Sequence, residues 1–228
     1  MTNLAIIPAR GGSTRLKNKN ILPLGGKPLI CHTVEAVIES GLFDTILVAT
    51  DSKAIAQVVY GYPEVGIRWR DSRYADARST VLDALLAMLP DLDRHDTFSY
   101  FLPTCPFRTS DDIMGGMSLL TETVTSVVSV CEYEFPIQLA VRMSPCYDIL
   151  PVQYHLVEGD TNSKYLKKHY HPNGGFYITR WDSLVRCGGF FKGIVKGYIM
   201  TKEHSLDIND AFDLEVAECL ISKGQYSQ

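Results

Sequence analysis

The sequence predicts an α/β fold in which helices flank a mostly parallel central sheet. In the first hundred residues, short apolar runs rich in β-branched side chains alternate with segments of helical spacing, which is the pattern of βαβ units. The chain has 228 residues, 46% of them hydrophobic, which is enough to bury one sizeable core. We therefore expect a single domain over residues 1–228.

The elements of the first half follow from this periodicity. Strands are expected at 4–8, 45–49, 66–70, 98–102 and 124–131, with helices at 28–38, 54–60 and 80–89. Pro28 suits the start of the first helix, and Gly41 suits its C-terminal cap. Thr109, followed three positions later by Asp112, is close to a capping box and predicts a further helix start.

The periodicity fades between residues 133 and 171, where Pro136, Pro145 and Pro151 interrupt the chain. This stretch predicts an excursion from the sheet that serves as a lid or a dimerisation arm, and residues 187–197 predict a shorter one. Strands at 175–179 and 194–200 and helices at 180–186 and 210–222 complete the expected fold, with Gly224 capping the last helix.

The composition argues against several functional classes. A net charge of −4 disfavours broad nucleic-acid binding, which uses a basic face, and no apolar run approaches the ~18 residues that span a membrane. No basic segment precedes the first apolar stretch, so we expect a cytoplasmic protein. The six cysteines include no C-x-x-C pair, which predicts free thiols without a disulfide framework or a zinc site.

Cations and glycines gather in the loop after the first strand. Eighteen residues without an acid contain Arg10, Arg15, Lys17, Lys19 and Lys27. Gly11, Gly12 and Ser13 lie at the carboxyl end of the strand, where open α/β sheets bind ligands, and glycines let the backbone approach a phosphate. The loop has neither G-x-G-x-x-G nor the G-K-[ST] of a Walker loop. A phosphate site of another type and a solvated basic turn remain the two interpretations.

Longer motifs point to one family. The run I-I-P-A-R-G-G-S-x-R-x-x-x-K-N, which begins at Ile6, resembles the signature of the acylneuraminate cytidylyltransferases, the CMP-sialic acid synthetases. Segments 44–51, 102–109, 172–178, 198–200 and 205–209 resemble later motifs of that family in the same order. The resemblance implies a Rossmann-like nucleotidyltransferase that joins CMP from CTP to a nine-carbon, sialic-acid-like 2-keto acid sugar (a nonulosonic acid). It also implies a homodimer.

The resemblance assigns roles to individual positions. It implies nucleotide contacts from Arg10, Gly11, Gly12, Ser13, Lys19, Asn20, Arg70 and Thr80. It implies sugar contacts from Leu102, Thr104, Arg108, Asn173, Tyr177, Phe190 and Phe191, with the two phenylalanines given across a dimer interface. Arg10, Lys19 and Asp207 are then the expected catalytic residues, because transfer at phosphorus needs positioning and charge compensation.

The expected cofactor is Mg²⁺, with Asp207 and Asn209 as candidate ligands. The family's common form is D-I-D, so Asn209 leaves one carboxylate fewer unless Asp210 or a water molecule replaces it. This departure motivates an alternative in which the protein binds nucleotide without transferring it. A structural alternative for Asp207 is the N-cap of the last helix.

Further departures concern the sugar. Leu102 stands where many members carry glutamine, which suits a sugar with an acylated amine or a deoxy carbon, of the legionaminic or pseudaminic type. Cys105 replaces a serine and is interpreted as a packing residue, since the motif places no base beside it. The closest rival is a Kdo-type cytidylyltransferase, although its first loop usually lacks the double glycine.

Overall fold

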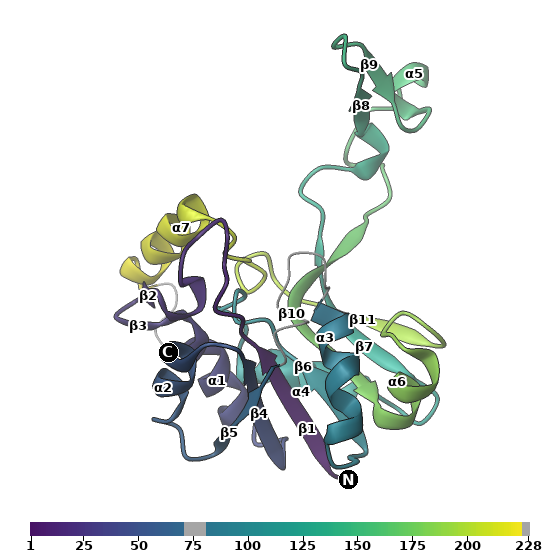
Figure 1. Cartoon of the computed structure of the whole chain (residues 1–228). Helices are drawn as coiled ribbons and strands as arrows, with labels where there is room; N and C mark the ends of the chain where they lie inside the picture. The colour runs from purple at the N-terminus through teal and green to yellow at the C-terminus, as the bar shows by residue number, and fades with distance from the viewer. Residues whose placement is uncertain (71–80, 225–228) are drawn as a thin grey trace.

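One seven-stranded sheet organises the chain. The computed structural model describes residues 1–70 and 81–224. The strand order is β11-β7-β10-β6-β1-β4-β5 (Figure 1). These strands are β1 (Asn3–Pro8), β4 (Thr45–Thr50), β5 (Val65–Trp69), β6 (Thr97–Tyr100), β7 (Ser126–Glu132), β10 (Tyr170–Arg180) and β11 (Val195–Ile199). Neighbouring strands run parallel except that β10 is antiparallel to β6 and β7, so the predicted mostly parallel α/β sheet is confirmed.

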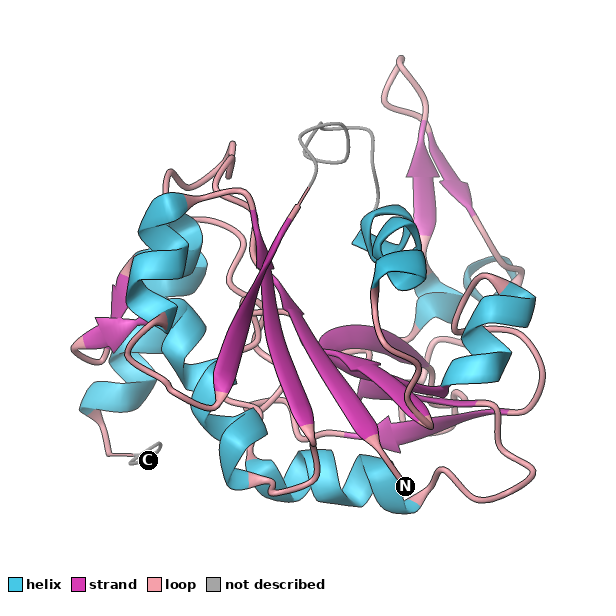
Figure 2. Cartoon of the chain, turned by 60° about the horizontal axis from the view of Figure 1, so that its bottom comes forward, coloured by secondary structure: helices cyan, strands magenta, loops and turns pink. Residues whose placement is uncertain are grey.

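Helices cover both faces of the sheet (Figure 2). Alternation along β1 explains this arrangement, because side chains of neighbouring strand residues point to opposite faces. Ala5 and Ile7 share a buried cluster with α1 (Leu29–Glu39), α2 (Lys53–Val59) and α4 (Ser110–Ser118). Leu4 and Ile6 share another with α3 (Val81–Met88) and α6 (Trp181–Cys187).

The last helix forms a third, smaller cluster. Within α7 (Ala211–Ser222), Ala217 packs with Leu24, Leu29 and Phe107. Leu24 belongs to a short hairpin of β2 (Pro23–Leu24) and β3 (Lys27–Pro28), which the sequence pattern did not predict. The helix therefore lies beside the first loop and the start of α1.

Local signals at the helix ends behave as predicted. Gly41 follows α1 with φ of 62°, a left-handed conformation that glycine adopts without strain. Thr109 accepts a hydrogen bond from the Asp112 amide, and the Asp112 carboxylate accepts one from the Thr109 amide, which completes a capping box. Both predicted boundaries are confirmed.

The strand predicted at 175–179 is longer in the structure. β10 begins at Tyr170, which pairs with Glu132 of β7, and the register shifts between Pro172 and Tyr177. This irregularity breaks the alternation of apolar and polar residues, which hid the first half of the strand from the sequence pattern. Within residues 1–70 and 81–224, short 3-10 helices also occur at Lys19–Ile21, Leu89–Asp91 and Ile137–Leu139.

Residues 133–169 leave the sheet between β7 and β10 and run away from the body of the molecule (Figure 1). We call this segment the arm. It holds the hairpin of β8 (Val141–Met143) and β9 (Ile149–Pro151) and the short helix α5 (His155–Glu158). The residues predicted as a second excursion divide between the end of α6, a loop and the start of β11. Among the residues described, no helix combines the length and apolarity that a membrane span requires.

Candidate active site

The first loop is held against the end of the neighbouring parallel strand. The backbone N–H of Gly11 donates to Asp51 Oδ1 at 2.7 Å, and Asp51 directly follows β4. A Cβ atom at Gly11 would lie 2.9 Å from Cβ of Ser52, closer than side-chain atoms normally approach. A residue larger than glycine would therefore push the loop away from β4.

Asn20 supports the same loop from inside. Its side chain is 5% exposed, and its Nδ2 donates to the carbonyl oxygen of Arg10 at 3.0 Å. The family resemblance implies a nucleotide contact at this position. In the structure the Asn20 amide supports the backbone next to the cation Arg10, and the nucleotide contact stays a prediction.

Two cations of the loop reach the segment that precedes α7. Lys19 Nζ donates to the carbonyl oxygen of Ile208 at 2.8 Å, and Arg15 Nη2 donates to Asn209 Oδ1 at 2.9 Å. These contacts join residues separated by about 190 positions in the chain. The first and the last motif of the sequence therefore form one site at the carboxyl edge of the sheet.

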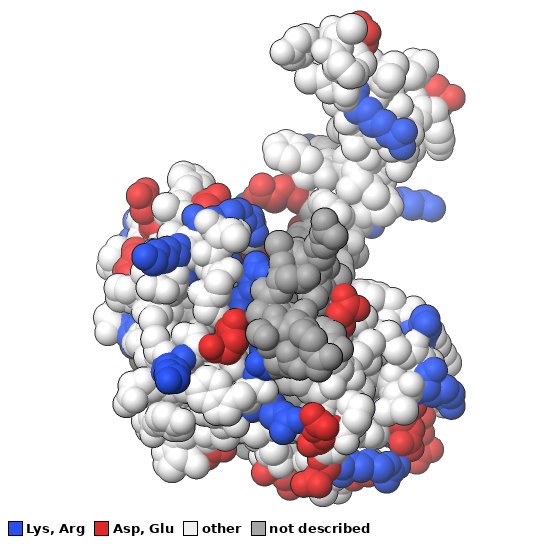
Figure 3. All heavy atoms as spheres, viewed as in Figure 1, with Lys and Arg blue, Asp and Glu red and all other residues white. Residues whose placement is uncertain are grey.

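Two cations of this site, Lys19 and Arg70, are partly buried and have both acidic and basic groups nearby. Burial is the largest influence on Lys19 and lowers the pKa of its ammonium group, while the charge of Asp207 opposes that shift. Burial likewise lowers the pKa of Arg70, which Asp51 raises and Arg10 lowers. Lys and Arg atoms lie beside Asp and Glu atoms along the middle of the face shown in Figure 3. Together, the cations Lys19, Arg70 and Arg10 favour binding of a polyanion such as a triphosphate.

Asp207 has one engaged and one unengaged carboxylate oxygen. Oδ2 accepts a hydrogen bond from Asn209 Nδ2 at 2.8 Å, whereas Oδ1 is buried and has no hydrogen-bond partner among the described residues. A buried anionic oxygen without a partner is costly, and a bound cation would satisfy it. This feature fits Asp207 as a ligand of Mg²⁺.

The alternative interpretation of Asp207 as a helix N-cap is wrong. Asp210 caps α7, since its carboxylate accepts the backbone N–H groups of Phe212 and Asp213. Asp213 returns a hydrogen bond from the Asp210 amide and so completes a capping box. The sequence pattern placed the helix start correctly but allowed two aspartates near it.

Asn209 is not placed as a free ligand in this structure, because its side-chain oxygen accepts from Arg15 and its amide donates to Asp207. Within residues 1–70 and 81–224, no three His, Cys, Asp or Glu side chains converge on a common metal position. Mg²⁺ characteristically binds through one or two carboxylates plus substrate phosphates, so a single protein carboxylate is compatible with it.

The segment 102–109 borders the same site. The backbone N–H of Ile208 donates to the Thr104 carbonyl oxygen at 2.7 Å, which places Thr104 next to Asp207. Leu102 packs against Gly174, where φ is 78° and an added Cβ would lie 2.9 Å from Leu102 Cδ1. The left-handed φ favours glycine at 174, and an added Cβ would also force the Leu102 side chain to shift.

Tyr177 lies on an aromatic surface. Its ring stacks on Tyr100 at a centroid distance of 4.5 Å and an angle of 9°. Burial raises the pKa of its hydroxyl, the hydrogen bond with Tyr100 opposes the shift, and the charge of Asp207 adds to it.

Two predicted sugar contacts have a different place in the structure. Arg108 is 0% exposed, donates from Nη1 to the carbonyl oxygen of Gly175, and lies over the ring of Phe101 at 5.2 Å. Asn173 is 4% exposed, and its Oδ1 accepts from Ser129 at 2.6 Å. Both side chains face the protein interior, where they join β10 to its neighbours.

The predicted exchange of a phenylalanine pair also differs. Phe190 is 3% exposed and packs within its own chain, 5.1 Å from the Tyr100 ring and 5.5 Å from the Tyr177 ring. It therefore backs the aromatic surface of this chain and does not extend toward a neighbour, while Phe191 is 63% exposed. Thr80, a predicted nucleotide contact, lies outside the described residues.

Two contributors were not singled out from the sequence. Asp51 anchors Gly11, and Tyr100 supports Tyr177. The available signal was position, because both lie at the carboxyl ends of strands adjacent to β1, which is the edge where ligands bind. Nothing in the local sequence indicated which neighbour each would contact.

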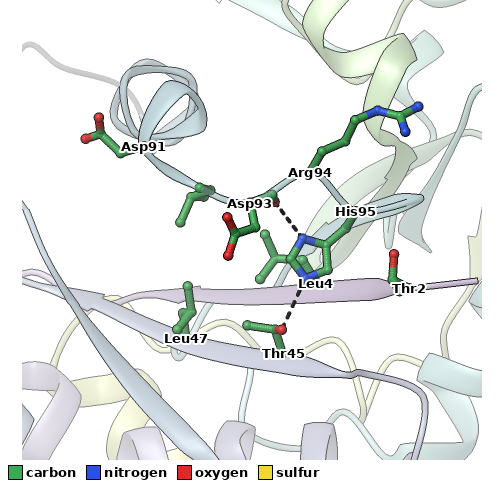
Figure 4. Close-up of a pocket in the computed structure, with 9 residues that line it drawn as sticks. Thr2, Leu4, Thr45, Leu47, Asp91, Asp93, Arg94 and His95 are labelled. Atoms are coloured by element: carbon green, nitrogen blue, oxygen red, sulfur yellow. Dashed lines mark hydrogen bonds between the residues drawn. The ribbon is translucent and has the colours of Figure 1, made fainter.

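A separate cavity of about 330 Å³ lies at the opposite edge of the sheet (Figure 4). It is lined by the amino-terminal residues of β1 and β4 and by residues 91–95. There the His95 ring contacts the Asp93 carbonyl oxygen at 2.7 Å and the Thr45 hydroxyl at 3.1 Å. The cavity is remote from the first loop, so it is not part of the candidate site.

Comparison with known proteins identifies the family of the chain. A sequence model of the family described as Cytidylyltransferase matches residues 4–102. The CMP-N,N'-diacetyllegionaminic acid synthase of Legionella pneumophila is 32% identical over 99% of this chain and 98% of that protein. The chain belongs to the cytidylyltransferase family.

Other family members give further context. The N-acylneuraminate cytidylyltransferase of Escherichia coli O18:K1:H7 is 32% identical over 94% of this chain and 51% of that protein. The chain thus spans about half the length of such relatives. The pseudaminic acid cytidylyltransferase of Campylobacter jejuni is 28% identical over 96% of each chain.

The fold of this family member also resembles that of solved structures. A CMP:2-keto-3-deoxy-manno-octonic acid synthetase in complex with CTP superposes with a TM-score of 0.74 at 16% identity, covering 98% of this chain and 100% of that one. At this identity the likeness extends to the fold alone. It agrees with the observed α/β fold, in which helices flank a mostly parallel sheet.

Proposed function

We propose that this cytidylyltransferase transfers CMP from CTP to the anomeric hydroxyl of a nine-carbon 2-keto acid sugar and releases pyrophosphate. The observation that carries the proposal is the meeting of Lys19 and Arg15 with the segment around Asp207. Cations suited to a triphosphate thereby lie beside a carboxylate with one unengaged oxygen. The relatives at about 30% identity that span the whole chain support the same chemistry.

In this proposal the cations bind the phosphates and the glycines position the backbone of the loop. Arg10, Lys19 and Arg70 hold the phosphates and compensate the charge that builds up as the hydroxyl attacks the α-phosphorus and pyrophosphate leaves. The glycines of the loop, anchored through Gly11 to Asp51, set the distance between backbone amides and phosphate. Positioning by these groups replaces covalent catalysis.

Asp207 Oδ1 is the proposed protein ligand of Mg²⁺, with phosphate oxygens completing the coordination. Bound there, Mg²⁺ would act as a Lewis acid toward the phosphoryl oxygens. Asn209 serves mainly to orient Asp207 and Arg15, since its side chain bonds to both. One carboxylate fewer near the metal predicts a higher Mg²⁺ requirement than in a relative with two.

The proposed sugar is of the legionaminic or pseudaminic type. Leu102, packed on Gly174 at the edge of the site, presents an apolar surface where a hydroxyl would find no hydrogen-bond partner from this side chain. A deoxy carbon or an acyl methyl group suits such a surface better. Tyr177 and the exposed ring of Phe191 are the proposed aromatic neighbours of the sugar.

The test is a pyrophosphate-release assay with CTP, Mg²⁺ and four acids: N-acetylneuraminic, legionaminic, pseudaminic and Kdo. Release with legionaminic or pseudaminic acid above the other two is the expected result. A preference for Kdo would replace the substrate assignment. Silence across the panel with CTP binding intact would support the alternative of a nucleotide-binding protein without transferase activity, and Asp207→Asn serves as the control for background hydrolysis.

We also propose that the protein acts as a homodimer joined through the arm. The arm carries strongly exposed apolar side chains, among them Phe135 at 78%, Met143 at 63% and Ile149 at 61%. Exposed apolar patches on extended segments are typical of interaction surfaces. A second copy is the proposed partner, in keeping with the arm's origin between β7 and β10 next to the site.

A further inference from the structure

The segment Thr201–Asn209, between β11 and α7, carries Asp207 and is tied to α4 by a hydrogen bond between two side chains. His204 Nδ1 lies 2.8 Å from Asp112 Oδ2, and Asp112 is 6% exposed at the start of α4. The two residues are 92 positions apart. The hydrogen bond therefore ties the segment to a helix that belongs to the rigid body of the fold.

Asp112 is itself fixed in place. Its Oδ2 accepts hydrogen bonds from the Thr109 amide at 3.0 Å and the Thr109 hydroxyl at 2.9 Å, and Oδ1 accepts from the Tyr198 hydroxyl at 3.4 Å. Since the capping box determines its rotamer, the carboxylate presents a preset position to His204. The hydrogen bond from the imidazole to this carboxylate then holds His204, and with it the backbone of the segment, in place.

The backbone around His204 is bonded to the site on either side of it. The Cys105 thiol donates to the His204 carbonyl oxygen at 3.2 Å, and Asn173 Nδ2 donates to the Ser205 hydroxyl at 2.7 Å. Beyond Asp207, the Ile208 amide donates to the Thr104 carbonyl oxygen at 2.7 Å. Asp207 thus lies between two anchored points, and at the first of them His204 adds a side-chain contact to that of Asn173 with Ser205.

We propose that His204 and Asp112 are positioning residues for the reaction, which set the place of Asp207 without touching substrate. This inference rests on the proposed cytidylyl transfer for its kinetic consequence. A small displacement of a group that acts on the reacting phosphate can lower turnover about 100-fold while leaving the remaining nucleotide contacts intact. Loss of the pair is therefore expected to lower kcat and leave KM for CTP nearly unchanged.

Two variants of His204 separate positioning from general stability. His204→Leu removes the N–H donor, whereas His204→Asn places an amide N–H close to the position of Nδ1 and keeps the hydrogen bond to Asp112. We expect kcat to fall about 10- to 100-fold in His204→Leu, with KM for CTP within about twofold of the wild type, and to recover largely in His204→Asn. Glu203→Ala, an exposed neighbouring position, is the matched control and should retain wild-type kcat.

A second readout does not depend on transfer. Hydrogen exchange of the Ile208 amide, which is bonded to Thr104, should accelerate at least tenfold in His204→Leu and stay near the wild-type rate in His204→Asn, with β1 amides unchanged in both. A wild-type protein silent on every sugar would overturn the proposed function, and the exchange rates would still decide the anchoring role. Unchanged Ile208 protection in His204→Leu, or a rise in KM for CTP with kcat intact, overturns the positioning role. Should His204→Leu fail to fold, His204→Ala takes its place with the same expected outcomes.

Discussion

At the residue scale, Lys19 has the most sharply defined role, because it lies between the cations of the loop and the backbone next to Asp207. We predict that Lys19→Ala raises KM for CTP about 10- to 100-fold, the loss expected for one charge-assisted hydrogen bond to phosphate. Steady-state kinetics measure this, with the exposed Lys17→Ala as the control. Unchanged kinetics in Lys19→Ala would remove the assignment.

The lowered pKa of Lys19 adds a pH dependence with a definite sign. A lysine binds phosphate only while protonated, and burial moves its loss of charge to a lower pH than for a free side chain. CTP affinity that depends on Lys19 should therefore decline as the pH rises into the alkaline range. In Lys19→Ala this part of the decline should be absent from a titration of CTP binding against pH.

Cys105 gives a prediction of chemical inertness. It is fully buried, and burial raises the pKa of its thiol to about 12. Because the thiolate is the nucleophile and predominates only above the pKa, nearly all of Cys105 is protonated at pH 8. Iodoacetamide at pH 8 should modify the exposed Cys146 and Cys219 and leave Cys105 intact in peptide mass spectra. Alkylation of Cys105 as fast as Cys146 would contradict its interpretation as a packing residue.

At the scale of elements, the two aspartates before α7 separate stability from activity. Asp210→Ala removes the N-cap and should lower the free energy of unfolding by about 1 kcal/mol. Asp207→Asn should leave that free energy close to the wild-type value and abolish CMP transfer, because it removes the proposed metal ligand. Urea denaturation and the pyrophosphate assay measure the two effects. The reverse pattern would show that Asp207 supports the helix.

Helix ends and side-chain orientations show how far the sequence predicts an element. Helix starts were predictable from local chemistry, as at Thr109 and Asp112, because a capping box involves residues three positions apart. The orientation of Arg108 and Asn173 was not, because a motif fixes only their place in the chain. Whether each side chain faces a ligand or the interior depends on β10, whose irregular register comes from tertiary pairing.

At the scale of the whole molecule, the sheet was predictable because βαβ periodicity is local. The antiparallel insertion of β10 was not predictable, because it depends on pairing between segments that are distant in the sequence. The site followed from the same topology, since the carboxyl ends of β1, β4 and β6 meet at one edge. The contacts of Lys19 with Ile208 and of His204 with Asp112 join distant segments. No pattern within one segment can reveal such pairs.

The arm gives the last prediction, which concerns assembly. Met143 and Ile149 are register partners in the hairpin of β8 and β9, so they lie on one face of it, and both are more than 60% exposed. A face of this kind is stabilised by a partner that removes it from water, and the proposed partner is a second copy. Light scattering of the wild type should give twice the 25.5 kDa chain mass.

Charges on that face test the assignment directly. The double variant Met143→Glu with Ile149→Glu should shift the protein to a monomer, because two carboxylates would have to be buried in the interface. Arg142→Glu is the matched control: Arg142 pairs with Leu150, so its side chain lies on the opposite face of the hairpin, and the dimer mass should persist. A wild-type protein that is monomeric and fully active, or a double variant that stays dimeric, would place the interface elsewhere or remove it.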